Sequence, residues 1–384
     1  MNWNTYLFDP LSPLVLRTGR PFDNQAGDPV SLDFPLPTTM AGAFRTTFGD
    51  HNDWVFSEKT DELKSISVHG PLAVAIDNEK LTPLFPKPAD AVYLRDEQKK
   101  TEVYHLQPER LKDGEITDLP HHGLNPVFLQ KEGKFKPDRG STWWNNEVFL
   151  QWLAGPSLMK TELELLGWNG PERELRTHVA IDRKTFAAEK SRLFQTEGMD
   201  FGPCRRDREC YSGWYSRRYG LMAHVGQEDK DDISADFCRL GGEGRMCAIK
   251  SVADVWPVLQ GDLKEKIVAA KAVRLILATP ALFADGWKPG WLDDNLTGTP
   301  PDFPDIKLTL RSFVCPRWQP ISGWDLKTRK TRAVRRMVPA GSVYWFDVVE
   351  GGEKLPDLWL QPINDAAQDG RDGFGLVTIG IWEK

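Results

Sequence analysis

The chain has 384 residues, a net charge of −6 and a hydrophobic content of 40%. This length exceeds the roughly 250 to 300 residues at which a single hydrophobic core stops growing, so we expect two domains of unequal size. The composition excludes a disordered chain, and the apolar runs fall short of the ~20 residues that span a bilayer.

The first third of the chain predicts strands, one helix and a long insertion. Residues 6–8 and 14–16 are apolar and predict an opening strand that prolines interrupt. A helix is expected over residues 37–49, because Thr38 supplies a hydroxyl cap and apolar residues follow at helical spacing. From about residue 83 to 141 the chain is rich in proline, glycine and residues of both charges, and its apolar residues show little periodicity. This region therefore predicts a surface insertion with little regular structure.

A projecting β-hairpin is predicted over residues 175–197. Residues 176–181 read like a strand, residues 182–185 have turn chemistry, and residues 191–196 follow as the returning strand. The hairpin belongs to a predicted N-terminal domain of residues 1–255. The C-terminal domain of residues 256–384 is expected to hold a helix over 263–272 and strands over 274–279, 307–314 and 341–349. This mixed order of helices and strands predicts an α+β, ferredoxin-like fold for the two domains.

Two glycine-rich loops, each followed by an apolar strand, are the most informative local pattern. The first reads Arg-Leu-Gly-Gly-Glu-Gly-Arg over residues 239–245, and the second reads Gly-Arg-Asp-Gly-Phe-Gly over residues 370–375. Glycines let backbone N–H groups turn toward one anion, and arginine forks suit phosphate. The spacing matches neither a dinucleotide fingerprint nor a nucleotide phosphate loop. A tight turn without a ligand explains such a loop equally well, but two copies with arginines favour a sugar-phosphate chain.

Basic residues are concentrated in one segment although the whole chain is acidic. Residues 307–336 contain nine Lys or Arg residues and one acid. Such a run is often only a solvated face, but it is also the pattern of a surface that contacts phosphates. The 15 tryptophans are mostly expected in the core, and the sequence does not identify any of them as a base-stacking residue.

The sequence gives little indication of catalysis or of a bound cofactor. His178 lies near Asp182 in the predicted hairpin and is the one candidate general base for RNA cleavage. A structural, hydrogen-bonded histidine is the favoured interpretation. The five cysteines form no Cys-x-x-Cys pair, so we expect reduced thiols in a cytoplasmic protein with no metal site. The N-terminus also lacks the features of a secretory signal.

Together these segments resemble the RAMP superfamily of CRISPR systems and, within it, the third subunit of the Cmr module, the type III-B effector complex. The resemblance rests on residues 11–22, 35–43, 178–194, 240–245, 277–283 and 338–344, which follow in the expected order along nearly the whole chain. It implies two ferredoxin-like, RRM-related domains with glycine-rich loops and a projecting hairpin. No counterpart matches residues 83–141.

The resemblance also implies a function and partners. A member of this family is expected to hold the 5′ tag of the guide RNA and to join the large polymerase-palm subunit to the RAMP backbone subunit, without nuclease activity and without a cofactor or membrane contact. The alternative is a RAMP-type, metal-independent endoribonuclease that matures guide RNA. The residues expected to contact RNA are Arg17, Arg20, His178, Arg183, Lys184, Gly241, Gly242, Gly244, Arg245, Arg332, Arg335, Arg336, Gly373 and Gly375.

Overall fold

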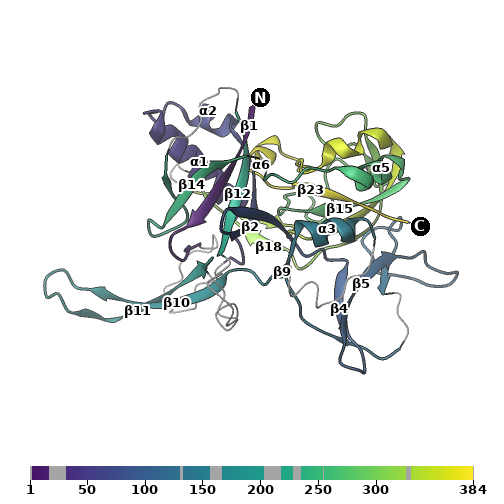
Figure 1. Cartoon of the computed structure of the whole chain (residues 1–384), viewed down its shortest axis with the longest axis horizontal. Helices are drawn as coiled ribbons and strands as arrows, with labels where there is room; N and C mark the ends of the chain where they lie inside the picture. Colours follow the sequence, from purple (N-terminus) through teal and green to yellow (C-terminus); the bar gives the residue numbers. More distant parts are fainter. Residues whose placement is uncertain are drawn as a thin grey trace.

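The computed structural model describes residues 2–16, 32–129, 133–155, 167–202, 218–227, 235–253, 255–325 and 330–383. Two β-sheets stand beside each other, and helices pack around them (Figure 1). A long hairpin extends from the first half, and a small sheet lies below the second half. The fold is therefore a mixture of helices and strands, rich in strands, as the sequence predicts.

The first large sheet is antiparallel, with the strand order β13-β14-β1-β12-β2-β3-β8-β9. Its strands are β1 (Asn2–Pro10), β2 (Ser67–Asp77), β3 (Lys80–Pro86), β8 (Trp143–Asn145), β9 (Gly167–Trp168), β12 (Arg218–Gln227), β13 (Phe237–Arg239) and β14 (Met246–Val252). The helices α1 (Pro37–His51), α2 (Thr60–Ser65) and α3 (Asn146–Leu153) belong to this half of the chain. Residues Met40, Phe44 and Phe48 of α1 recur at helical spacing and are buried in one core with Tyr6 and Phe8 of β1.

The second large sheet has the order β16-β17-β22-β15-β23. Its strands are β15 (Ala272–Leu277), β16 (Thr297–Gly298), β17 (Lys307–Val314), β22 (Val343–Glu350) and β23 (Val377–Ile381). The helical segments of this half are α5 (Gly261–Ala269), the 3-10 helix η2 (Gly352–Leu358) and α6 (Ala367–Arg371). A ribbon of short strands leaves it between β17 and β22 and comprises β18 (Gln319–Ile321), β19 (Trp324–Asp325), β20 (Lys330–Thr331) and β21 (Arg335–Met337).

The expectation of an irregular insertion over residues 83–141 is wrong. This region forms a small sheet in the order β6-β5-β4-β7, made of β4 (Ala91–Arg95), β5 (Thr101–Pro108), β6 (Val127–Leu129) and β7 (Lys136–Pro137). It docks on the second large sheet, because the backbone N–H of Ala89 donates to the carbonyl of Gly341 at 2.7 Å and that of Asn125 donates to Arg311 at 2.7 Å. The insertion therefore ties the two halves of the chain together.

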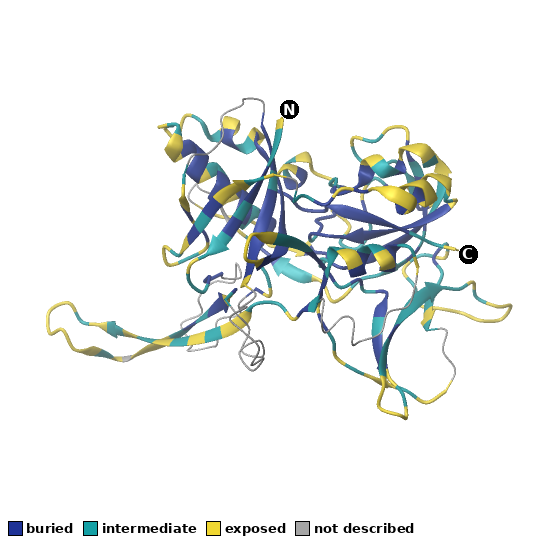
Figure 2. Cartoon of the chain, in the orientation of Figure 1, coloured by how far each residue is buried: buried dark blue, intermediate teal, exposed yellow. Residues whose placement is uncertain are grey.

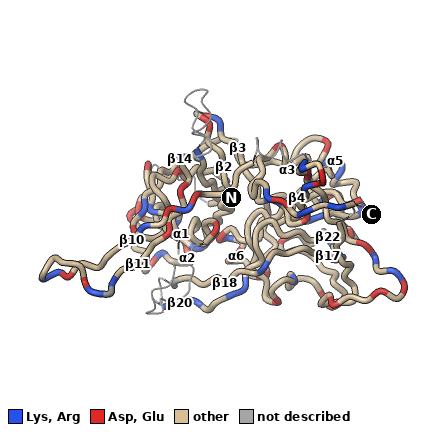
Figure 3. The backbone as a smooth tube through the Cα atoms, turned by 90° about the horizontal axis from the view of Figure 1, so that it is seen from below, with Lys and Arg blue, Asp and Glu red and all other residues tan. Residues whose placement is uncertain are grey.

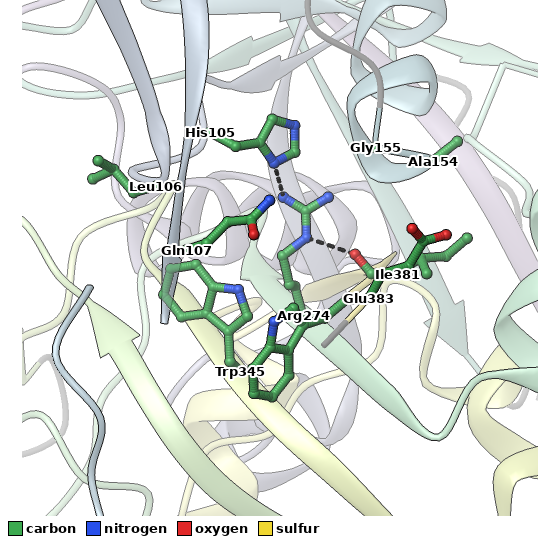
Figure 4. A pocket seen from close by; sticks show the side chains of 10 residues that line it. His105, Leu106, Gln107, Ala154, Gly155, Arg274, Trp345, Ile381 and Glu383 are labelled. Carbon is green, nitrogen blue, oxygen red and sulfur yellow. Dashed lines mark hydrogen bonds between the residues drawn. The ribbon is translucent and has the colours of Figure 1, made fainter. Parts of the chain in front are cut away.

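A buried ion pair fixes this docking. Arg274 of β15 pairs with Asp90 of the insertion, and the two side chains are 2% and 0% exposed. The remaining guanidinium donors reach the carbonyl oxygens of Ile381 at 3.0 Å and Trp152 at 2.8 Å, and His105 lies on the other side of the group (Figure 4). Because every charge at this site has a partner, the burial of the ions is compensated.

Candidate nucleic-acid interface

The first glycine-rich loop joins β13 to β14 and lies at the surface. Gly241 and Gly244 have φ values of 83° and 65°, a backbone region that favours glycine. The N–H of Gly242 donates to the carbonyl of Val15 at 2.8 Å, which holds the loop against the segment after β1. A side chain at Gly241 would collide with Leu16, whereas a side chain at Gly244 would meet open space. The predicted exposed loop is present.

Charged side chains connect this loop to the base of the hairpin formed by β10 (Glu172–Ile181) and β11 (Ala188–Asp200). Arg245 pairs with Glu243 at 3.0 Å, and Arg176 of β10 pairs with Glu174 at 2.8 Å. Hydrogen bonding to Arg176 lowers the pKa of Glu174, and the charge of Arg245 adds to this effect. The pKa of Arg176 is raised by Glu174, with a further contribution from Glu243. The loop and the hairpin base thus share one cluster of alternating charges.

The hairpin itself projects from the molecule, as predicted, and its outer half is exposed on both faces (Figure 2). Arg183 and Lys184 are exposed in the turn at its tip, where the Asp182 carboxylate accepts the N–H groups of Lys184 and Thr185 at 2.7 and 2.9 Å. These hydrogen bonds lower the pKa of Asp182. Arg183 follows Arg176 by seven positions along the hairpin, which corresponds to roughly 20 Å. The structure therefore does not bring the tip residues to the glycine loop.

His178 lies on the same face of the hairpin as Arg176, farther from the base. Its Nε2 is 2.7 Å from the Thr196 hydroxyl, and its ring stacks on Phe194 with centroids 5.1 Å apart. The Asp182 carboxylate is bound to the turn and not to His178. These contacts fit a structural histidine, the interpretation that the sequence favours over a general base.

The prediction that the second glycine-rich loop is exposed is wrong. Gly373 and Gly375 are buried, and so is Phe374 between them. A Cβ at Gly373 would lie 2.4 Å from the carbonyl oxygen of Val68 in β2, and Phe374 is part of the core of the first half. Gly373 permits close packing between the two halves, and Gly375 packs against Asn364 of its own half, so neither offers a surface to RNA.

The predicted basic residues 332–336 lie on the ribbon of short strands. Arg332 and Arg336 are exposed and have no ion pair among the described residues. Arg336 covers the ring of the exposed Trp318 at 5.3 Å. Arg335 instead makes two hydrogen bonds to Asp369, at 2.8 and 2.5 Å, which raise its pKa. Figure 3 shows Lys and Arg in the ribbon around β18 and β20, inward from the hairpin, although β18 itself holds none.

Two predicted residues, Arg17 and Arg20, lie outside the described residues. Two others were missed by sequence reasoning. Arg176 lies near the glycine loop, since the charge of Glu243 contributes to its raised pKa, and the alternation of the strand places it on the same face as His178. Trp318 is a candidate stacking residue, and its nearness to the basic segment was the available signal.

Among the described residues, no helix has both the length and the apolar character needed to cross a membrane.

Comparisons with known proteins give one family. The model of a CRISPR-associated protein family, Cas_Cmr3, matches residues 6–382. No curated protein sequence matches the chain. Similar solved structures include a chain of the type III-B Cmr-beta complex bound to cognate target RNA, with or without AMPPnP. Each has a TM-score of 0.43 and 15% identity, covering 89% of this chain and 86% of the other. A chain of a type III-A Csm3-Csm4 subcomplex has a TM-score of 0.33 and 13% identity, covering 90% of this chain and 94% of the other.

Proposed function

The chain belongs to the family of CRISPR-associated Cmr3 proteins, and on that premise we propose that it is a non-catalytic RNA-binding subunit of a type III-B effector complex. In this role it holds the 5′ tag of the guide RNA and joins the large polymerase-palm subunit to the RAMP backbone subunit. The two halves would correspond to two ferredoxin-like, RRM-related domains.

One observation carries the RNA-binding proposal: an exposed glycine loop lies at the base of a projecting hairpin and shares a charge cluster with it. Gly241, Gly242 and Gly244 present backbone without side chains, and Arg245 and Arg176 flank it. An RNA backbone that approaches the loop would offer phosphates to guanidinium groups that the free protein pairs with Glu243 and Glu174. Each arginine would then exchange a carboxylate for a phosphate, to which its planar guanidinium can make two hydrogen bonds.

The experiment compares RNA binding by wild type and by an Arg176→Gln/Arg245→Gln variant at several salt concentrations. We expect the affinity of the full chain for tag RNA to fall about tenfold. The negative slope of log affinity against log salt concentration should become shallower by about 1.4, since two phosphate contacts are lost and each contributes about 0.7 with single-stranded RNA. The matched control is Lys59→Gln, which removes an exposed cation next to α2. An unchanged slope in the double variant would refute the proposed contact.

The same preparation separates this role from that of an endoribonuclease. We expect repeat RNA to stay intact, because His178 is bonded to Thr196 and stacked on Phe194. Site-specific cleavage that disappears in His178→Ala would establish the enzyme instead.

A further inference from the structure

A second candidate site lies between the two halves of the molecule, away from the glycine loop. It is a cavity of about 350 Å³, within the usual size range of small-molecule sites. Its walls come from Trp3, His69 and His224 of the first sheet and from Trp256 and Lys264 of the second half. Trp3 lies at the start of β1, whereas the glycine loop adjoins the end of that strand, roughly 23 Å away at about 3.3 Å per residue. Figure 1 shows this end of β1 beside the N-terminus.

One wall of the cavity is a stack of flat rings. The ring of Trp3 stacks on His224 with centroids 5.0 Å apart and planes at 13°, and Trp256 stacks on the same imidazole at 5.0 Å and 10°. His224 is fixed by a hydrogen bond of 2.9 Å between its Nδ1 and the Thr5 hydroxyl. Both tryptophans are only partly buried. Such rings offer π faces on which a planar heterocycle can stack.

His69 supplies polar atoms inside the cavity. It is 5% exposed, and none of the described residues makes a hydrogen bond with its imidazole. Burial lowers its pKa to about 3, so the ring is neutral near pH 7 and offers one donor and one acceptor. A ligand in the cavity can therefore form hydrogen bonds with this ring. The edge of a nucleobase carries donors and acceptors that fit this ring.

The rim of the cavity carries one charge of each sign. Lys264 lies in α5, Asp357 lies in η2, and both are exposed. A lysine binds phosphate as a point charge, and a carboxylate is a common acceptor for ribose hydroxyl groups. We propose that this cavity binds a purine nucleoside phosphate, with the base on the Trp256 face and its edge toward His69. Asp357 then faces the ribose and Lys264 the phosphate. A purine fits better than a pyrimidine because it covers more of the aromatic wall.

The test is titration calorimetry of the full chain with AMP, adenosine and UMP. AMP should bind one to one and more tightly than UMP. Trp256→Ala should weaken AMP binding roughly ten- to a hundredfold, as expected for the loss of one stacking ring, whereas Trp256→Phe should retain most of the affinity. Lys264→Gln should weaken AMP binding but leave adenosine binding unchanged. Lys266→Gln, an exposed change on the same helix, is the matched control.

Competition identifies the source of the nucleotide. Displacement of AMP by a 5′-phosphorylated RNA octamer that starts with adenosine would identify the ligand as an RNA end, and failure to displace it would identify a free nucleotide. The proposal is overturned if AMP, adenosine and the octamer all fail to bind here, or if neither Trp256→Ala nor Lys264→Gln weakens AMP binding. The Arg176→Gln/Arg245→Gln variant should bind AMP normally, so the proposal for this site and the proposal for the tag site can be refuted separately.

Discussion

Glycines with the same sequence signature have opposite roles in the two loops. Gly244 has a φ of 65° and faces open space, whereas Gly373 has a φ of 92° and touches the backbone of Val68 and Gly70. The sequence predicted two glycine-rich loops before strands, and both are present. It did not predict the burial of Gly373, because that depends on a strand some 300 residues earlier in the chain.

The two glycines therefore predict different costs on substitution by alanine. Gly244→Ala should lower the free energy of unfolding by about 1 to 2 kcal/mol, the cost of a Cβ in left-handed backbone. Gly373→Ala adds a collision at 2.4 Å with a backbone oxygen, so the loss should reach roughly 3 kcal/mol or more. Urea denaturation of both variants measures the difference. Equal losses would contradict the packing role of the second loop.

At the scale of elements, local patterns predicted the hairpin but not the insertion. The strand-like segment 176–181, the turn residues 182–185 and the returning segment 191–196 indicated a hairpin, and β10 and β11 confirm it. The helix predicted from Pro37 is also confirmed, but no side chain caps α1, and it continues past Gly49 to His51. In the insertion, β4, β6 and β7 are short, β5 and β7 each end in a proline, and the insertion buries a charge, Asp90. Short strands of this kind show no detectable periodicity in the sequence. The sequence also does not show that Asp90 is buried, because its partner, Arg274, lies in the second sheet.

The hairpin is expected to be a separable element. Its contacts with the rest of the chain lie at its base, where Leu14 exchanges hydrogen bonds with Met199 and Arg173 pairs with Asp33. Residues 177–195 can be replaced by Asn-Gly, because Arg176 and Thr196 face each other in the ladder and a two-residue turn joins such a pair. We expect the free energy of unfolding to change by less than ~1 kcal/mol, as for exposed positions.

Urea denaturation checks the stability of this shortened chain, and filter binding checks its RNA affinity. The outer part of the hairpin exposes apolar side chains to solvent, so removing them should not open the core; they are Val179, Ile181, Phe186, Leu193 and Phe194. A loss of several kcal/mol would show that the hairpin packs on the body of the protein. Unchanged RNA affinity would remove the outer hairpin from the proposed interface.

For the whole molecule, the sequence predicted two units but not how they meet. Phe374 from the second half fills the core of the first, and Arg274 of the second sheet holds the insertion of the first half. The stack of Trp3, His224 and Trp256 also joins the two halves. These contacts join residues far apart in sequence, and composition and periodicity contain no information on such pairs.

The junction makes stability depend on pH through its buried histidines. Burial lowers the pKa of His69 to about 3 and that of His224 to about 4, both below the value of ~6.5 in an unfolded chain. As pH falls below 6.5, these two imidazoles bind protons in the unfolded chain but stay neutral in the folded protein. The stability is therefore complete above pH 6.5 and is lost as pH falls toward the folded pKa values.

Between pH 7 and pH 5, His69 alone should lower the free energy of unfolding by about 2 kcal/mol. His224 should contribute less, because it is only partly buried and water still screens its charge. Urea denaturation at the two pH values measures the loss, and His69→Gln should reduce it by about the same 2 kcal/mol. The exposed His122, changed to glutamine, serves as the control and should leave the loss as in wild type. If His69→Gln behaves like this control, the imidazole of His69 does not stay neutral at the junction.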